Sequence, residues 1–226
     1  MVSGYSFAFL NNSTPNKAME LYYQTHSPYA RKVLVLIHEL GLTSQTKVTH
    51  YETSPTLKNK TVFNKNPLGK VPILLDKGLT MFDSSVICRY LLDSYNNNSK
   101  VTATTISYQM EALATGIADA GILARWEIHR RPEAKRHQPF LDGQLLKLSE
   151  AYDYLERQAV ALGGKKLDFG EIALACSLAW VNYVQLPCFA TSRPKLKRWY
   201  EEHKQRQSMA LTAYSGTTTD LVKHNN

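Results

Sequence analysis

The sequence predicts a mixed α/β domain with a four-stranded sheet, followed by an all-helical domain. Residues 19–96 alternate short β-prone runs with helical patterns in the order βαβαββα, whereas residues 103–207 contain long helical patterns and no convincing strand. A polar break at residues 97–102 predicts a linker between the two domains. Residues 1–18 are interpreted as an N-terminal extension and residues 208–226 as a C-terminal tail.

The first predicted strand leads directly into a helix. Residues 19–24 are β-prone, and residues 29–40 carry apolar side chains at helical spacing. Ser27 fits the N-cap position and Pro28 the first helical position, while Gly41 is placed to end the helix. These residues therefore predict a βα unit.

The remaining elements of the first half complete a mixed sheet. They are a strand at 47–51, a helix at 55–64, a hairpin of strands 71–75 and 79–82, and a helix from about Ser84. This order combines parallel and antiparallel strand pairs, as in thioredoxin-like domains.

The second half is predicted to be a helical bundle. Its expected helices are 103–130, 142–162, 168–184 and 193–206, with Gly163-Gly164 and Pro187 between them. Asp168, with Glu171 three residues later, has the pattern of a capping box before an apolar helix.

The composition indicates a globular protein, with 43% hydrophobic and 20% charged residues. No segment approaches the ~20 apolar residues that a membrane-spanning helix needs, so we expect no membrane partner. The N-terminal extension lacks the basic start of a secretory signal, and three widely spaced cysteines in apolar surroundings do not suggest disulfides. We therefore expect a cytoplasmic protein.

The net charge of +8 does not identify a partner. The basic residues are scattered, and the aromatic residues between them form no base-stacking pattern, so we expect no nucleic-acid partner. No Cys/His cluster predicts a metal site.

Three ordered segments carry the functional signal. They are 25–33 (THSPYARKV), 66–74 (NPLGKVPIL) and 82–91 (FDSSVICRYL). Together they resemble the glutathione-binding domain of cytosolic glutathione transferases, and residues 168–181 resemble the helix-nucleating motif of the C-terminal domain in that superfamily. The resemblance is strongest to serine-containing bacterial and fungal members.

The resemblance implies an enzyme that adds the glutathione thiolate to small hydrophobic electrophiles in detoxification. It implies glutathione as co-substrate, no metal, and a homodimer. Two alternatives remain open, a glutathione-binding regulatory or ligand-carrying protein with little turnover and a glutathione-dependent reductase. Exchange of the glutaredoxin type is disfavoured, because serine occupies the position of the cysteine nucleophile.

The resemblance also implies roles for particular residues. Ser27 stands where the family has its catalytic serine or cysteine, and its hydroxyl and the helix N-terminus would favour a thiolate. A plain helix cap is the structural reading of Ser27. Tyr23 is the alternative catalytic residue, although strand alternation points only one of Tyr22 and Tyr23 toward a cleft.

The glutathione-binding residues implied by the resemblance are Lys70, Val71, Pro72, Asp83 and Ser84. Val71 would pair with the cysteinyl backbone before a cis Pro72, and Lys70 would hold the glycyl carboxylate. Ser84 and Asp83 would bind the carboxylate and the ammonium of the γ-glutamyl end. Asp83 is shorter than the glutamate of many members, which changes the hydrogen-bond geometry there.

A second-substrate site is expected against the first long helix of the C-terminal domain. Ile122, Arg125, Trp126 and His129 share one face of that helix. Core packing is the alternative reading of this stripe.

Overall fold

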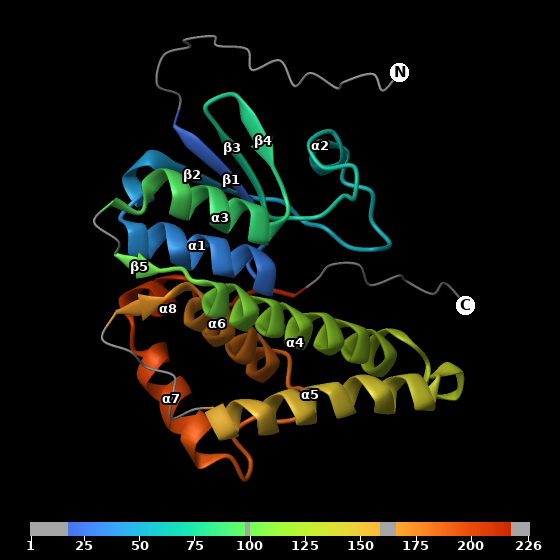
Figure 1. Cartoon of the computed structure of the whole chain (residues 1–226). Coiled ribbons are helices and arrows are strands. Elements are labelled where there is room, and N and C mark those ends of the chain that lie inside the picture. Colours follow the sequence, from blue (N-terminus) through green and yellow to red (C-terminus); the bar gives the residue numbers. More distant parts are fainter. Residues whose placement is uncertain (1–17, 98–99, 159–165, 218–226) are drawn as a thin grey trace, which may run out of the picture.

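A mixed sheet with helices on both sides forms the first half of the chain (Figure 1). The computed structural model describes residues 18–97, 100–158 and 166–217. The elements of this half are β1 (Met19–Tyr23), α1 (Pro28–Leu40), a 3₁₀ turn (Thr43–Gln45), β2 (Thr46–His50), α2 (Lys60–Phe63), β3 (Ile73–Asp76), β4 (Leu79–Met81) and α3 (Ser84–Tyr95). The predicted order and the thioredoxin-like class are confirmed.

The sheet has the strand order β2-β1-β3-β4. β1 runs parallel to β2 and antiparallel to β3, and β3 runs antiparallel to β4. α1 and α3 lie on the side of the sheet that faces the helical domain (Figure 1). On the other side, Val62 of α2 joins a small cluster with Tyr22, Val71 and Ile73.

Local sequence explains where α1 begins and ends. The Ser27 side chain caps its N-terminus and Pro28 takes the first position, where no amide hydrogen is needed. Gly41 ends the helix in the left-handed conformation at φ 76°, which glycine adopts at little cost.

The second half is helical, with a short strand pair that the sequence did not indicate. Its elements are β5 (Val101–Thr102), α4 (Thr105–Arg130), a 3₁₀ turn (Glu133–Lys135), α5 (Gln138–Gln158), β6 (Leu167–Asp168), α6 (Phe169–Tyr183), α7 (Pro194–Lys204) and α8 (Gln207–Leu211). The expectation of no strand here was wrong, because β5 and β6 pair in parallel. Such two-residue strands are too short to show a period-2 pattern.

α6 is the central helix of this half, and Asp168 is its N-cap, as the predicted capping box requires of its first residue. The Asp168 carboxylate accepts the Gly170 amide at 2.7 Å. Gly121 lets α4 approach α6 closely, because a Cβ there would lie 2.7 Å from the Trp180 ring. The core cluster runs continuously from the sheet through α1 into these helices.

Two predicted helices have different bounds. Residues 55–64 form a helix only at α2, because the Asn59 side chain caps the amides of Thr61 and Val62 and so fixes the start at Lys60. The helix predicted at 142–162 begins earlier, at Gln138.

The division into domains 19–96 and 103–207 stays a prediction. Within the predicted linker at 97–102, residues 98–99 lie outside the described residues. So do Gly163-Gly164, the end of the helix predicted at 142–162, residues 1–17 of the predicted extension, and residues 218–226 of the predicted tail. α8 overlaps the start of that tail, at Gln207–Leu211.

A buried ion pair joins the two halves. Lys32 of α1 donates to Glu111 of α4, and both side chains are less than a tenth exposed. Ser85 of α3 donates to the same carboxylate oxygen at 2.6 Å, and Thr115 does so at 3.2 Å. Glu111 therefore holds α1, α3 and α4 together.

We expect Glu111→Leu to lower the free energy of unfolding by about 3–5 kcal/mol, because it leaves Lys32 as an uncompensated buried charge. The double variant Lys32→Met/Glu111→Leu should recover most of this loss, since neither charge of the pair is then left buried without its partner. Urea unfolding measures both. As a control, Asp93→Asn breaks only an exposed pair with Arg89 and should cost less than about 0.5 kcal/mol. A loss below about 1 kcal/mol for Glu111→Leu would contradict the assignment.

Candidate active site

The sheet topology brings the three motif segments to one edge. β1 and β4 end at this edge, and β3, antiparallel to both, begins there. Ser27 follows β1, Val71 precedes β3, and Asp83 follows β4. Residues far apart in the sequence thus surround one region at the start of α1 and α3.

Ser27 occupies the turn between β1 and α1. Its hydroxyl oxygen accepts the Ala30 amide at 3.2 Å, and the side chain is buried. Its backbone amide donates to the Gln24 carbonyl at 3.0 Å, which closes the turn. A serine hydroxyl that accepts through a lone pair still has its own proton to donate. Capping α1 and donating to a ligand are therefore compatible roles.

Tyr22 and Tyr23 point to opposite sides of β1, as strand alternation requires. Tyr22 packs against Tyr51, with ring centroids 4.3 Å apart. Tyr23 lies in the main core cluster, close to Arg31 and Cys176, and burial raises its pKa to about 12. Its phenol therefore stays protonated at neutral pH.

The bond between Val71 and Pro72 is cis, as expected. Both residues are buried, and the β1–β3 ladder ends at the pair Tyr22–Ile73, so Val71 lies just beyond it. The preceding loop is fixed by Asn66, whose side-chain amide donates to the Lys70 carbonyl at 3.0 Å. The Lys70 side chain is exposed beside this edge.

Asp83 and Ser84 stand at the N-terminus of α3. The Asp83 carboxylate caps the helix by accepting the amides of Ser85 at 3.1 Å and Val86 at 3.4 Å. Asp83 is exposed, whereas Ser84 is buried in the first helical position. The bond between Phe82 and Asp83 is also cis. An exposed carboxylate at the N-terminus of a helix can meet the ammonium of a zwitterionic group, while the helix end favours its carboxylate.

α4 continues past this region from the helical half. Tyr29 of α1 donates to Asp119 of α4, which fixes the two helices side by side. The predicted second-substrate residues follow within the next three turns of α4: Ile122, Arg125 and Trp126 are partly buried and His129 is exposed. Ile122 packs against the core, and the Arg130 guanidinium lies 5.5 Å from the Trp126 ring centroid.

His129 lies in a basic environment. Partial desolvation of the ring, together with the guanidinium groups of Arg125, Arg136 and Arg130, lowers the pKa of His129. The imidazole is thus mainly neutral at pH 7, while the arginines beside it carry positive charge. This end of α4 combines an indole, a neutral imidazole and cations.

A polar cluster beside Ser27 was missed from the sequence. Glu52 follows β2 and accepts Gln24 at 3.0 Å, and its carboxylate lies 3.7 Å from His26 and 3.2 Å from His50. The Trp180 indole of α6 donates to the His26 carbonyl at 3.1 Å. Only the parallel pairing of β1 with β2, which places their ends together, could have indicated this cluster.

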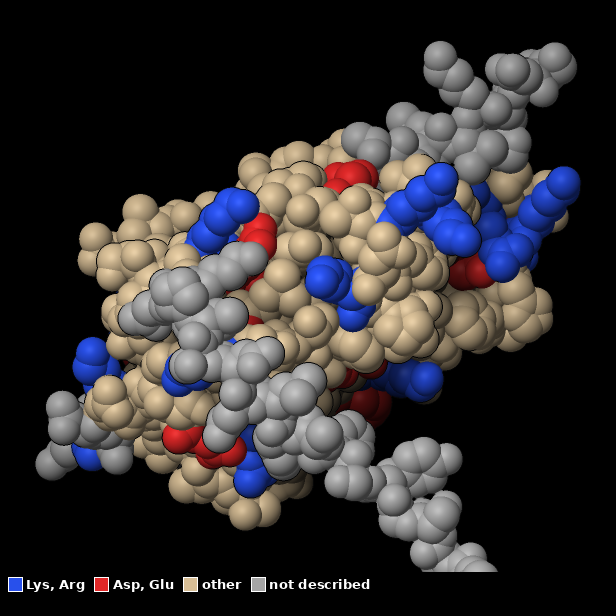
Figure 2. Space-filling model, turned by 90° about the horizontal axis from the view of Figure 1, so that it is seen from above, with Lys and Arg blue, Asp and Glu red and all other residues tan. Residues whose placement is uncertain are grey.

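Basic side chains do not form one continuous patch on the face of the molecule seen from above (Figure 2). On the face seen in Figure 2, lysine and arginine side chains stand in several separate places. In the described part of the chain, no group of three His, Cys, Asp or Glu side chains could hold a metal ion. Among those same residues, no helix is both long and apolar enough to cross a membrane.

Known proteins are similar to this chain in sequence and in fold. Residues 26–94 match the family model for the glutathione S-transferase N-terminal domain. The chain is 30% identical over 203 residues to the uncharacterised GST-like protein YibF of Escherichia coli K12, covering 86% of this chain and 98% of that protein.

Solved structures agree with this match. A glutathione transferase family member from Pseudomonas fluorescens Pf-5 with bound glutathione superposes with a TM-score of 0.81 at 33% identity, covering 88% of this chain and all of that one. A second structure from the same organism, with bound S-(propanoic acid)-glutathione, has a TM-score of 0.78 at the same identity and coverage. The chain belongs to the cytosolic glutathione transferase superfamily.

We expect Asp83→Ala to lower the free energy of unfolding by about 1 kcal/mol, because α3 loses a side-chain cap for two amides. Asp83→Asn should change it by only a few tenths of a kcal/mol, since asparagine caps as well as aspartate. Urea unfolding of both variants is the measurement. Equal losses for the two substitutions would mean that the carboxylate charge, rather than the cap, stabilises this position.

Proposed function

We propose that this chain is an enzyme that binds glutathione at the edge formed by Ser27, Val71 and Ser84 and transfers its thiolate to small hydrophobic electrophiles. The observation that carries the proposal is the meeting of the three motif segments at one edge of the sheet. The two solved relatives with bound glutathione or a glutathione conjugate support it.

Ser27 is the proposed donor to the thiolate. A thiol of pKa ~8.5 must drop by about two units to be mostly ionised at neutral pH, which requires roughly 2.7 kcal/mol of preferential stabilisation. A hydrogen bond to a charged group contributes about 1.5–3 kcal/mol. A helix N-terminus adds about 0.3–1 kcal/mol. One serine hydroxyl together with the N-terminus of α1 can therefore supply the stabilisation that the thiolate requires.

Tyr23 is the alternative donor. Its high pKa does not prevent donation, because a neutral phenol donates a hydrogen bond. Its side chain, however, belongs to the core cluster between the sheet and the helices, where packing accounts for its burial. We therefore prefer Ser27.

The glutathione backbone and ends would bind around Ser27. The Val71 amide and carbonyl, held by the loop before Pro72, would pair with the cysteinyl backbone. Ser84 and Asp83 would bind the γ-glutamyl end, and the exposed Lys70 would approach the glycyl carboxylate. The Asp83 cap uses only one carboxylate oxygen for the helix amides, so the other is available for an ammonium group.

The electrophile would lie against α4, beyond the contact of Tyr29 with Asp119. Trp126, about 10 Å further along the axis, offers an apolar surface, and Ile122 and Arg125 border it. His129 completes the proposed wall as a neutral imidazole.

A homodimer is part of the proposal. Val86 on α3 and Ile106 on the first turn of α4 are exposed apolar side chains, at 52% and 68%. The two elements are adjacent, because Arg89 lies over the Tyr108 ring at 5.0 Å. A second copy on this face would bury both. Sedimentation analysis of the wild-type chain tests this point.

We expect Ser27→Ala to raise the pKa of the bound glutathione thiol by about 1–2 units, and kcat/KM for a chloronitrobenzene at pH 7 to fall ~10–100-fold. The deficit should shrink as the pH rises above the new pKa, because the thiol then ionises without the serine. The pH dependence of kcat/KM and the ultraviolet absorption of the thiolate measure both effects.

Two controls separate catalysis from stability. Thr104→Ala removes the corresponding N-cap of α4, whose hydroxyl accepts the Ser107 amide at 3.2 Å, and should cost similar stability with unchanged thiol pKa. Tyr23→Phe should also leave the thiol pKa unchanged. If Tyr23→Phe raised it and Ser27→Ala did not, Tyr23 would be the donor. Tight glutathione binding without turnover across an electrophile panel would favour the ligand-carrying alternative.

A further inference from the structure

Arg31, in the motif that starts α1, is buried although its side chain is charged. Only 4% of it is exposed. Its guanidinium donates to the Met209 carbonyl at 2.9 Å and to the Thr212 hydroxyl at 3.3 Å. It also lies over the Tyr214 ring, 4.2 Å from the centroid. No carboxylate among the described residues forms an ion pair with it, so α8 and the residues that follow it supply its main polar and aromatic contacts.

The segment Thr212–Gly216 runs from Arg31 to the turn that carries Ser27. The Tyr214 hydroxyl donates to the Cys176 carbonyl at 2.9 Å, and the Tyr183 hydroxyl donates to the Gly216 carbonyl. The Ser215 amide donates to the Thr25 carbonyl at 3.3 Å. Thr25 lies two residues before Ser27, so the end of this segment is bonded to the active-site turn.

Gly216 shows how close this approach is. It has φ 74°, and a Cβ added there would lie 3.4 Å from the Thr25 hydroxyl oxygen. On the inner side of the same turn, the Trp180 indole holds the His26 carbonyl. The turn is therefore bonded both by α6 and by the segment that Arg31 anchors.

We propose that Thr212–Gly216 is a structural part of the thiolate site, and that Arg31 is a positioning residue that orients Ser27 through this segment. The inference rests on the proposed function. Without the anchor, the segment would leave the turn and Ser27 would lose its fixed orientation. Val71 and Ser84 would stay in place, so glutathione would still bind. The expected signature is a weaker thiolate with nearly unchanged affinity.

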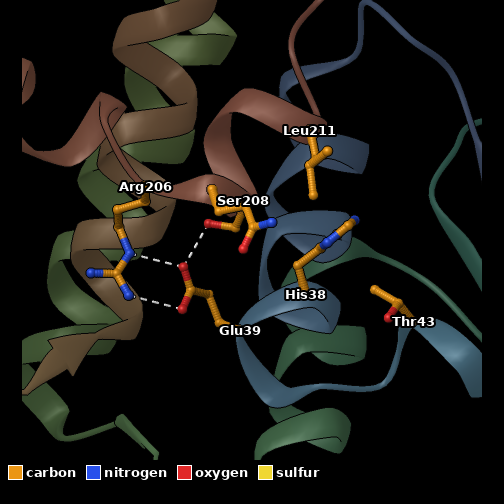
Figure 3. A pocket seen from close by; sticks show the side chains of 7 residues that line it. His38, Glu39, Thr43, Arg206, Ser208 and Leu211 are labelled. Carbon is orange, nitrogen blue, oxygen red and sulfur yellow. Dashed lines mark hydrogen bonds and ion pairs between the residues drawn. The ribbon is translucent and has the colours of Figure 1, made fainter.

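A second contact between α1 and α8 provides the control (Figure 3). Glu39, at the far end of α1, accepts Arg206 at 2.8 and 2.9 Å and Ser208 at 2.5 Å, beside a pocket lined by His38, Thr43 and Leu211. Glu39 is twelve residues from Ser27, about 18 Å along the helix. Breaking this contact weakens the same helix pair without touching the turn.

Other titratable groups near the turn stay unchanged in the test. They are His26, Glu52 and His50 on the side of β2. Tyr23 from β1, Cys176 from α6 and Tyr214 surround Arg31 itself. The substitutions at Arg31 and at Tyr214 alter different groups, but both loosen the segment Thr212–Gly216. A rise in the thiol pKa that appears in both variants is therefore due to that segment.

The variants are Arg31→Met, Arg31→Lys, Tyr214→Leu and Glu39→Gln in the full chain. The pKa of the bound glutathione thiol, followed by thiolate absorption, and the glutathione affinity, by calorimetry, are the readouts. Arg31→Met and Tyr214→Leu should raise the thiol pKa by about one unit, a tenfold change in the ionisation constant, with affinity within threefold. Arg31→Lys should raise the thiol pKa by less than Arg31→Met does, and Glu39→Gln should leave it unchanged.

The outcomes separate the inference from the function. Wild-type protein that binds no glutathione overturns both. The inference alone is overturned if the wild-type protein lowers the thiol pKa and Arg31→Met has the same thiol pKa as the wild type. It is also overturned if Glu39→Gln raises the thiol pKa as much as Arg31→Met does. Should Arg31→Met fail to fold, Tyr214→Leu and Tyr183→Phe decide the question, since both weaken the hold on the segment and keep the Arg31 charge. Unshifted thiol pKa values in both would then overturn it.

Discussion

Two consecutive buried cations in α1 are the constraint on which the structure depends. Arg31 and Lys32 are both less than 5% exposed, although they lie in the helix that covers the sheet. A buried charge is costly unless it has polar partners. Lys32 forms an ion pair with Glu111 on α4, and Arg31 donates to carbonyl and hydroxyl oxygens of α8 and the residue after it. The two buried cations of α1 therefore have polar partners only when the helical half is docked against the thioredoxin-like half.

This constraint acts where the proposed chemistry takes place. α1 starts at Ser27, so whatever fixes the first two turns of α1 also fixes the serine hydroxyl and the helix-end amides. The contacts from the helical half reach the turn itself, through Trp180 to His26 and through Ser215 to Thr25. Preorganisation of this kind matters for a thiolate site, because a hydrogen-bond donor stabilises charge most when it needs no reorientation.

Much of the site was predictable because its residues are constrained locally. Ser27 before Pro28, Pro72 after Val71 and Asp83 before Ser84 each have a backbone role in a cap or a turn. A backbone role leaves a pattern that a short segment can show. The prediction of a helix over the whole of 55–64 was wrong: Asn59 accepts the amides of Thr61 and Val62 as an N-cap, so only Lys60–Phe63 is helical. The roles of Ser27 and Tyr23 in chemistry remain predictions, because either position satisfies the local pattern.

The sequence by itself determined the order of the elements, the three motif segments and the caps, because these depend on neighbours a few residues apart. Only the tertiary structure decided which polar side chains are buried and what they contact. Arg31, Lys32, Glu52 and Tyr214 have no local pattern that distinguishes them from surface residues. Apart from His50, which lies two residues from Glu52, their partners lie 26 to 183 residues away along the chain, at distances where periodicity carries no information. Docking of the two halves, rather than any motif, therefore determined the surroundings of the Ser27 turn.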